Sequence, residues 1–362
     1  MLVDPAHWAG RRVLVTGHTG FKGVWLSLWL REMGAEVTGL ALAQEEPSLF
    51  SQAALGNLID HVVGDIRDAG LVDDVIARAR PQTVFHLAAQ PLVRLSYDCP
   101  RETFATNVVG TVNVLDACRR VEGLDAIVAV TSDKCYENRE WVWPYRESDP
   151  MGGHDPYSAS KGAAELAISA YRNSFFDAPG SPLLASVRAG NVIGGGDWAK
   201  DRLVPDIVRA IIEHRSVQIR APKAIRPWQH VLEALGGYIL IAQHLALGER
   251  WAASAWNFGP AAQDTRPVDW IVRKMIDRWG QGSFEIDDAP QRHEAHLLKL
   301  DCTKAYSELG WRPAFDLART IDWIVDWHKQ VDQGADALQL TRKQILNYMA
   351  LFDAALTQGS NQ

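Results

Sequence analysis

The chain has 362 residues, 47% of them hydrophobic and 22% charged, which is the composition of an ordinary globular protein large enough for two lobes. Its net charge of -7 and pI near 5.9 argue against nucleic acid or an anionic membrane as the main partner, and no apolar run is long enough to span a bilayer. The four cysteines form no Cys-x-x-Cys pair and no disulfide-framework spacing, so we expect reduced thiols in a cytoplasmic protein.

Short apolar strands alternate with amphipathic helices in the first half of the chain. Strands are expected at 12–16, 36–40, 83–88, 126–131 and 183–188, and helices at 20–33, 102–119 and 157–176. This alternation predicts an α/β fold with a parallel, doubly wound, Rossmann-like sheet. After residue 190 the pattern becomes irregular, with helices expected at 202–215, 230–247, 268–279 and 303–309 and a strand at 256–258. We therefore expect a Rossmann domain over 1–190, to which the chain returns around 230–260, and a smaller mixed α/β lobe over 191–362.

A glycine-rich turn, Gly17-His18-Thr19-Gly20-Phe21-Lys22-Gly23, follows the first predicted strand and opens the first predicted helix. Small residues permit a tight turn and let a pyrophosphate approach the amino end of the helix, whose amides and dipole favour anions. The spacing is Gly-x-x-Gly-x-x-Gly rather than Gly-x-Gly-x-x-Gly, and such a turn can also serve packing alone. Between the flanking strand and helix it predicts dinucleotide binding.

The acidic residue that usually binds the adenosine ribose at the end of the second strand is missing. Residues 40–44 contain no carboxylate, and Glu45 and Glu46 come late. No arginine occupies the position either, which weakly favours NAD over NADP. Asp65 follows an apolar pair and could reach the adenine amino group, although a plain turn aspartate fits the sequence nearly as well.

Two reactive clusters lie close together in the sequence, Ser132-Asp133-Lys134 and Tyr157-Ser158-Ala159-Ser160-Lys161. Tyr157 and Lys161 are four residues apart, so on a helix they share one face. The lysine charge is then expected to lower the pKa of the phenol and to make Tyr157 a usable base. Alone, a Tyr-x-x-x-Lys pair is a weak signal.

Five motifs together resemble the extended short-chain dehydrogenases/reductases that act on nucleotide sugars, and the resemblance covers nearly the whole chain. They are the glycine-rich turn, His86-Leu87-Ala88-Ala89-Gln90, Asn107-Val108-Val109-Gly110-Thr111, Tyr157-x-x-x-Lys161 and Arg188-Ala189-Gly190-Asn191-Val192-Ile193-Gly194. Within this family, residues 131–136 and the turn at 17–23 look most like those of the 4,6-dehydratases that use CDP-D-glucose.

The resemblance implies NAD as the cofactor and a hydro-lyase reaction, in which the sugar is oxidised at C4, loses water across C5 and C6, and is reduced at C6. Its product would be CDP-4-dehydro-6-deoxy-D-glucose, at the first committed step toward CDP-linked deoxy sugars of lipopolysaccharide O-antigen. The residues implied to bind NAD are Gly17, Thr19, Gly20, Phe21, Lys22, Gly23, Asp65, Ile66, Leu87, Ala88, Ala89, Gln90, Thr106, Thr131, Tyr157 and Lys161.

By the same resemblance, Tyr157 takes the O4 proton, Ser132 bonds the O4 region and Asp133 protonates the departing hydroxyl. The next position is a glutamate base in the dTDP-glucose branch and is Lys134 here. An ammonium cannot abstract a proton, so Lys134 must either be neutral when it acts or stabilise the enolate while another group takes the proton. Glu137 is the second candidate for the C5 base, and Lys134 could also be an ordinary loop lysine.

The substrate residues implied by the resemblance are Ser132, Asn191, Arg202, Arg226, His230, Arg292 and His296. Arginine suits a diphosphate through its bidentate geometry, although each could be a surface arginine, and a lone histidine is more often structural. No His, Cys and Asp residues have metal-ligand spacing, so no metal is expected. We expect a homodimer or homotetramer. A dTDP-glucose or GDP-mannose 4,6-dehydratase, a 4-epimerase and an inert NAD-binding scaffold remain the alternatives.

Overall fold

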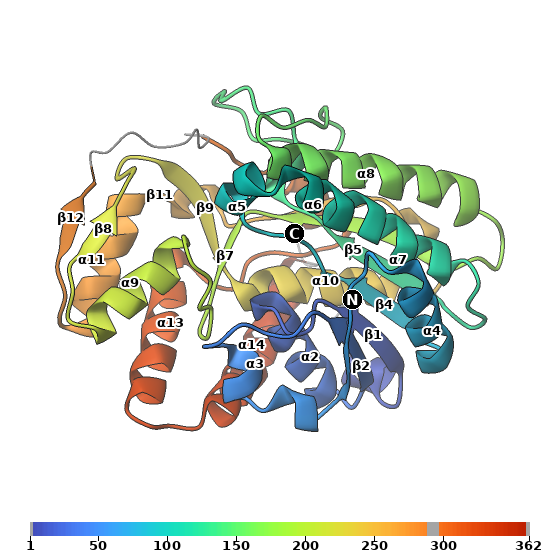
Figure 1. Ribbon diagram of the computed structural model, residues 1–362, viewed down its shortest axis with the longest axis horizontal. Helices are drawn as coiled ribbons and strands as arrows, with labels where there is room; N and C mark the ends of the chain where they lie inside the picture. Colours follow the sequence, from blue (N-terminus) through green and yellow to red (C-terminus); the bar gives the residue numbers. More distant parts are fainter. Residues whose placement is uncertain (1–2, 288–296, 360–362) are drawn as a thin grey trace.

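A computed structural model describes residues 3–287 and 297–359 (Figure 1). Seven parallel strands form the main sheet in the order β10-β6-β5-β4-β1-β2-β3. They are β1 (Arg12–Thr16), β2 (Glu36–Ala41), β3 (Asp60–Val63), β4 (Thr83–His86), β5 (Ala126–Val130), β6 (Leu183–Ala189) and β10 (Ala255–Phe258). The reversal of strand order between β1 and β4 creates the crevice at the carboxyl edge where sheets of this kind bind ligands.

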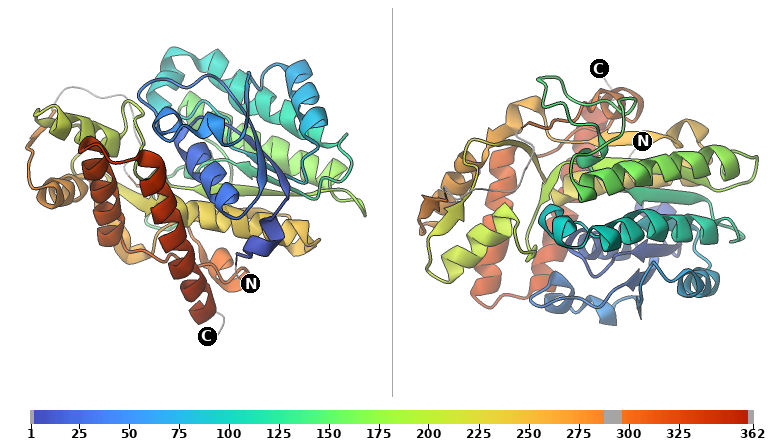
Figure 2. Two further views of the ribbon diagram at one scale, coloured as in Figure 1. Left: turned by 90° about the horizontal axis from the view of Figure 1, so that it is seen from below. Right: turned by 45° about the horizontal axis from the view of Figure 1, so that its top comes forward.

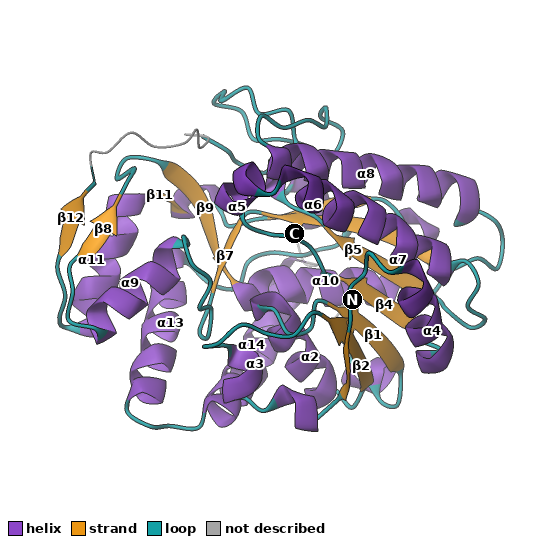
Figure 3. Ribbon diagram, in the orientation of Figure 1, coloured by secondary structure: helices purple, strands orange, loops and turns teal. Residues whose placement is uncertain are grey.

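Both faces of the sheet are buried because its strands are apolar on both sides. Val13 and Val15 belong to one hydrophobic cluster, and Leu14 between them belongs to another. Helices cover both faces, and Figure 3 shows them on either side of the sheet. The first cluster packs on α2 (Phe21–Glu32), α10 (Val231–Ala246) and α14 (Ala337–Gly359), and the second on α4 (Ala69–Ala79), α7 (Thr111–Cys118) and α8 (Pro156–Phe175).

A second group of elements stands beside the carboxyl edge of the main sheet (Figure 1). A three-stranded sheet joins β11, β9 and β7, and a two-stranded sheet joins β12 and β8. Their bounds are β7 (Asn191–Ile193), β8 (Val217–Ile219), β9 (Ile225–His230), β11 (Thr265–Pro267) and β12 (Phe284–Ile286). The third hydrophobic cluster lies between these strands and α9 (Leu203–Ile212), α11 (Val268–Trp279) and α13 (Leu317–Asp332).

Short helices occupy several of the connections. They are α1 (Pro5–Trp8), α3 (Leu49–Gln52), α5 (Val93–Asp98), α6 (Pro100–Phe104), α12 (Thr303–Glu308), η1 (Leu55–Asn57), η2 (Ala105–Gly110), η3 (Asp133–Cys135), η4 (Arg250–Ala252) and η5 (Ala262–Asp264). None of the helices in the described ranges has the length and apolarity that crossing a membrane requires.

The predicted fold class is confirmed, and the five strands predicted for the first half lie within two residues of their expected bounds, whereas β3 was not predicted. The helix predicted over 102–119 is present as an unbroken helical run over 100–118, but it contains a π-helical turn that was not predicted. The chain there runs through α6, a π-helical turn at η2 and then α7, since Asn107 is drawn into contacts with the β4 loop and with α8. The long helix α14 was not predicted; Figure 2 shows it beside α13.

A buried carboxyl group joins α10 to the C-terminal part of the chain. Glu233 on α10 accepts hydrogen bonds from the backbone nitrogens of Ala314, at 3.0 Å, and Phe315, at 2.7 Å. The Tyr348 hydroxyl on α14 donates to its second oxygen at 3.0 Å. Burial raises the pKa of Glu233 to about 8, so the carboxyl group is largely protonated at neutral pH.

Replacing Glu233 by glutamine should therefore make the protein more resistant to alkaline pH. The folded protein holds the proton more tightly than the unfolded chain, so the free energy of unfolding of the wild type falls as the pH rises from about 4.5 to about 8. Glutamine keeps the acceptor for both nitrogens and cannot ionise. The difference in free energy of unfolding should grow to about 5 kcal/mol above pH 8. Thermal unfolding at several pH values measures it, and parallel curves for the two proteins would contradict the expectation.

Candidate active site

The glycine-rich turn connects β1 to α2 at the carboxyl edge of the main sheet. Gly17 has φ of +78°, and a Cβ there would stand 2.7 Å from the Ala88 nitrogen. A Cβ on Gly23 would come within 2.1 Å of the Gly17 carbonyl oxygen. The backbone therefore closes tightly in front of the first turn of α2, where amide groups face the crevice and favour an anion.

Two titratable side chains belong to this turn. The His18 ring is buried, and its Nε2 lies 2.6 Å from Nδ1 of His61; burial lowers the pKa of His18 to about 4, so the ring is neutral at pH 7. Burial also lowers the pKa of Lys22 to about 7, and the neighbouring positive charges of Arg202 and Lys161 contribute. The charges of Lys161, Asp133 and Lys134 all act on Lys22, so Lys22 lies close to the candidate catalytic residues.

Tyr157 and Lys161 lie one turn apart on α8, as predicted, and both are buried. Lys161 Nζ is 3.5 Å from the Val130 carbonyl oxygen, and burial lowers the pKa of this lysine to about 8. Burial raises the pKa of Tyr157 to about 12, although a hydrogen bond with Ser132 opposes the shift. We expected the pKa of the Tyr157 phenol to be lowered. In the protein without cofactor it is raised, so that prediction is wrong. More positive charge must reach Tyr157 before it can act as a base.

The second cluster of candidate catalytic residues lies at a single turn, η3, shortly after β5. Ser132 caps it: its Oγ accepts from the Lys134 nitrogen at 3.2 Å and donates to Asp133 Oδ1 at 3.0 Å. Lys134 Nζ lies 3.4 Å from the same Asp133 oxygen. The Asp133 side chain is 2% exposed and that of Lys134 is 28% exposed. A buried carboxyl group and a more accessible amine thus stand side by side, next to the hydroxyl group that contacts Tyr157.

Glu137, the second candidate for the base, lies further along the same loop. Its side chain is 53% exposed, and Oε2 pairs with Arg139 at 3.2 Å.

The strands of the second group bring Gly190, which precedes Asn191, beside Asp133. Asn191 begins β7 and pairs with Trp228 of β9. A Cβ on the preceding Gly190 would stand 2.7 Å from Pro227 Cγ and 3.3 Å from Asp133 Oδ2. The start of β7 therefore passes between β9 and the catalytic turn.

Two arginines predicted to bind substrate flank this region. Arg202 precedes α9 and pairs with Asp197 at 3.2 Å, and its charge acts on both Tyr157 and Lys22. Arg226 lies on β9, where its Nη1 donates to the Ile225 carbonyl at 3.1 Å, directly opposite Arg266 of β11.

His230 does not line the pocket that we expected, and that prediction is corrected. The ring is completely buried, its Nδ1 accepts from the Leu232 nitrogen to cap α10, and it packs edge-on against Trp25 and Phe315. Burial lowers its pKa to about 3, so the ring is a neutral core residue. The other two predicted substrate residues, Arg292 and His296, lie outside the described residues.

The loop from Leu87 to Gln90 follows β4 and is tied to α8. The Ala88 nitrogen donates to Thr16 Oγ1 at 3.2 Å, and the Gln90 nitrogen donates to Asn107 Oδ1 at 2.8 Å. Asn107 in turn donates to Ser160 Oγ at 2.8 Å, between Tyr157 and Lys161 in the sequence. Ala89 belongs to this loop, and Thr106 precedes Asn107 on the π-helical turn. The loop is thereby fixed relative to the catalytic helix.

Asp65 and Ile66 follow β3. A Cβ on Gly110 would lie 2.6 Å from Ile66 Cδ1, so Ile66 packs against the helix that carries Thr106. The Asp65 carboxylate binds Arg67, with Nε 2.8 Å from Oδ2. The role of Asp65 toward adenine stays a prediction.

Sequence reasoning missed Glu165 and gave no role to Arg188. Glu165 lies on α8 four residues after Lys161, and Arg188 lies on β6; both are buried and form an ion pair at 2.8 Å. The spacing of four from Lys161 was a usable signal for a third polar residue on that face of the helix.

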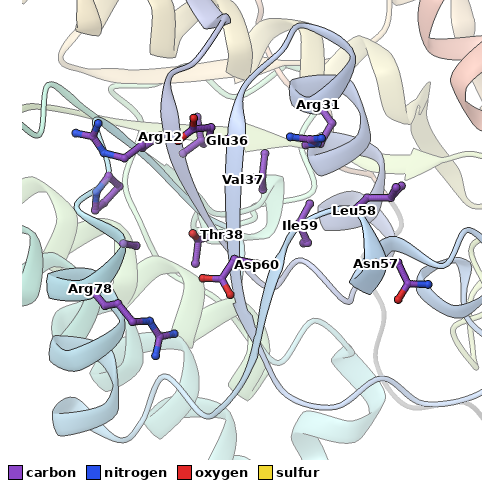
Figure 4. A pocket seen from close by; sticks show the side chains of 13 residues that line it. Arg12, Arg31, Glu36, Val37, Thr38, Asn57, Leu58, Ile59, Asp60 and Arg78 are labelled. Carbon is purple, nitrogen blue, oxygen red and sulfur yellow. The ribbon is translucent and has the colours of Figure 1, made fainter.

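A surface hollow of about 690 Å³ lies at the opposite edge of the sheet (Figure 4). Arg12, Glu36 and Asp60 line it from the amino ends of β1, β2 and β3. Figure 4 shows Arg12 and Arg31 on opposite sides of the hollow. None of the predicted catalytic or binding residues lines it.

A doubly wound sheet whose β5 and α8 supply a serine and a Tyr–Lys pair is characteristic of short-chain dehydrogenases/reductases, and the second group of elements indicates the extended, two-lobed type. The chain matches the family model for GDP-mannose 4,6 dehydratase over residues 14–323. It is 54% identical to a CDP-glucose 4,6-dehydratase of Salmonella typhimurium, over 96% of this chain and 99% of that relative.

Two solved structures share the fold. One is a UDP-glucose 4-epimerase of Thermus thermophilus in complex with NAD, with a TM-score of 0.76 and 26% identity over 90% of this chain and 99% of the other. The second is a dTDP-glucose 4,6-dehydratase of Streptomyces venezuelae with NAD bound, with a TM-score of 0.75 and 24% identity over 90% and 99% of the two chains. The chain belongs to the GDP-mannose 4,6 dehydratase family.

Proposed function

We propose that the protein is a hydro-lyase that converts CDP-D-glucose into CDP-4-dehydro-6-deoxy-D-glucose and water, with NAD regenerated in each turnover. The observation that carries this proposal is the turn at the end of β5, where Asp133 and Lys134 stand next to Ser132 and close to Tyr157. Oxidation at C4 needs only the Tyr–Lys pair, whereas dehydration needs an additional acid and base. The 54% identity to a CDP-glucose 4,6-dehydratase supports the same assignment.

The residues of the crevice fit NAD. The turn at 17–23 presents backbone rather than side chains in front of α2, and the loop after β4 closes against it at Ala88. We propose that Gly17, Thr19, Gly20 and Gly23 hold the pyrophosphate and that Tyr157 and Lys161 lie beside the nicotinamide ribose. When bound, NAD accepts a hydride from C4 of the sugar and returns it to C6, and its cationic ring lowers the pKa of a neighbouring phenol.

In the first step, Tyr157 takes the proton from the sugar O4. Ser132, which is hydrogen-bonded to Tyr157, is placed to bond the same oxygen. Lys161 contributes a positive charge that favours the phenolate below pH 8, where this lysine is mainly protonated.

In the second step, the C4 ketone acidifies the C5 proton and a base removes it. We assign this role to Lys134, whose amine is more accessible than the Asp133 carboxyl group. Asp133 is the acid that gives a proton to the C6 hydroxyl group as it leaves as water. Delivery of a hydride to C6 and of a proton to C5 then completes the product.

We propose that residues 1–190, with the returning segment 230–260, bind NAD and that 191–362 bind the sugar nucleotide. Asn191 follows Gly190, which lies next to Asp133, and the charge of Arg202 acts on Tyr157. Arg226 lies on β9, the strand that pairs with β7 beside this turn. A homodimer through α8 and its neighbours is part of the proposal. Large apolar side chains are exposed there: Phe104, Val109, Leu166 and Phe175.

Incubation of the protein with NAD and a panel of nucleoside diphosphate glucoses tests the proposal. A 4-keto product that absorbs strongly in alkali should form with the highest kcat/KM from CDP-glucose. Formation of CDP-galactose would instead identify a 4-epimerase. Preference for dTDP-glucose would overturn the assignment of cytosine as the nucleobase of the substrate.

Replacing Gly23 by alanine should weaken NAD binding roughly tenfold to a hundredfold. The new Cβ would meet backbone atoms of Gly17 and His18 at 2.1 Å and 2.6 Å, so the turn must open, and overpacking of this kind costs about 1–3 kcal/mol. Calorimetric titration with NAD measures the loss. Gly70→Ala is the matched control, because its Cβ would meet only Asp68 Oδ1 at an ordinary 3.5 Å. Equal affinities of the two variants would contradict the role of the turn.

A further inference from the structure

Glu165 and Arg188 form a buried ion pair that no step of the proposed reaction uses. Both side chains are 4% exposed. Glu165 accepts from Arg188 Nε at 2.9 Å and Nη2 at 2.8 Å, from Ser186 Oγ at 2.9 Å and from the Thr131 hydroxyl group. The carboxylate is therefore completely satisfied. Since a buried ion pair is often no more stabilising than apolar side chains of the same volume, stability alone does not explain its presence.

The partners of this ion pair flank the catalytic turn. Thr131, on one side of Ser132-Asp133-Lys134, donates to Glu165, and Tyr136, on the other side, accepts from Arg188 Nη1 at 2.7 Å. The guanidinium group also lies over the Tyr136 ring, 5.0 Å from its centroid. Both ends of the turn are thus held by one ion pair, and one member of that pair belongs to the helix of Tyr157 and Lys161.

Tyr157 itself is anchored independently of the ion pair. Its backbone nitrogen donates to Ser96 Oγ at 3.1 Å, and its carbonyl accepts from Ser160, which Asn107 holds. Loss of the ion pair would therefore shift the turn relative to Tyr157 rather than move Tyr157.

We propose that Glu165 and Arg188 are positioning residues for the dehydration step, which fix the turn bearing Ser132, Asp133 and Lys134 against the Tyr157 face of α8. This inference rests on the proposed function, since it assigns the elimination chemistry to that turn. Ser132 serves the oxidation step through Tyr157, so both steps should slow when the pair is disturbed. Loss of water depends on Asp133 and Lys134 as well and should slow more. The partially reacted state, with reduced cofactor and 4-keto sugar, should then accumulate.

The decisive variant is the double substitution Glu165→Gln with Arg188→Met, which removes both charges together and leaves neither one buried without a partner. We expect thermal unfolding close to that of the wild type, a nearly unchanged KM and a kcat about a hundredfold lower, as small misplacements of reacting groups produce. Absorbance of reduced nicotinamide should rise during turnover, and exchange of the C5 proton with solvent should slow in parallel with kcat. Glu233→Gln, the same substitution at a buried glutamate away from the turn, is the matched control and should show none of these kinetic effects.

A double variant that keeps wild-type kcat and accumulates no reduced cofactor would overturn the proposal and leave the ion pair a structural element. If the double variant does not fold, Tyr136→Phe removes the hydrogen bonds of the hydroxyl group with Arg188 and Asn257 and keeps the ring under the guanidinium group. It should show the same accumulation to a smaller degree, and wild-type kinetics in it would equally overturn the proposal. All variants are assayed with whichever nucleoside diphosphate glucose the wild type dehydrates best. The test of the positioning role therefore does not depend on whether CDP-glucose is the substrate.

Discussion

Replacing Tyr157 by phenylalanine should lower kcat by about 10²–10⁴-fold, because the proton on the sugar O4 then has no acceptor at the required place. The substitution removes one oxygen and leaves the buried ring in its packing position on α8. Since oxidation at C4 comes first, every later step should slow with it. We expect neither reduced cofactor nor exchange of the C5 proton when Tyr157→Phe is mixed with NAD and CDP-glucose.

Tyr171→Phe provides the control for this prediction. Tyr171 lies on the same helix, packs against Phe175 and Phe176, and takes no part in the proposed site. If Tyr157→Phe formed as much reduced cofactor as the wild type does, another group would have to accept the O4 proton. Binding of NAD and CDP, measured by calorimetry, should stay close to wild type, so that the loss is one of kcat and not of KM.

The parts of the site that the sequence predicted are those in which spacing along one element determines the geometry. Tyr157 and Lys161 share a helix face because they are four residues apart, and Ser132, Asp133 and Lys134 are consecutive residues after a strand. The glycine-rich turn was found for the same reason. Local spacing predicted where these side chains lie relative to one another. Their catalytic roles were predicted from the family resemblance.

The parts that failed depend on contacts between distant segments. His230 is the last residue of β9, and Trp25 from α2 and Phe315 from the C-terminal region pack against its ring. The pKa of Tyr157 was expected to fall because of Lys161, whereas burial, a property of the whole fold, dominates it. The π-helical turn at 105–110 likewise follows from the attachment of Asn107 to two other elements.

Replacing Lys134 by methionine should stop the reaction after C4 oxidation. The substitution keeps most of the side-chain volume and removes the amine beside Asp133. We expect exchange of the C5 proton with solvent to fall by about 10²–10⁴-fold and kcat to fall with it, as for the loss of a general base. Reduced cofactor should accumulate instead of passing through a short-lived maximum. Rapid-mixing absorbance and solvent-isotope incorporation at C5 measure the two effects separately.

Lys134→Arg separates the two roles open to this residue. An arginine keeps the positive charge and cannot lose a proton at working pH, so it can stabilise an enolate but cannot serve as the base. Loss of C5 exchange in both variants would identify the neutral amine as the base, whereas retention in Lys134→Arg alone would assign Lys134 to electrostatic stabilisation. Glu137→Gln completes the set. Its carboxylate is exposed and paired with Arg139, so C5 exchange should survive that substitution. Wild-type exchange in Lys134→Met together with loss of exchange in Glu137→Gln would overturn the assignment and identify Glu137 as the base.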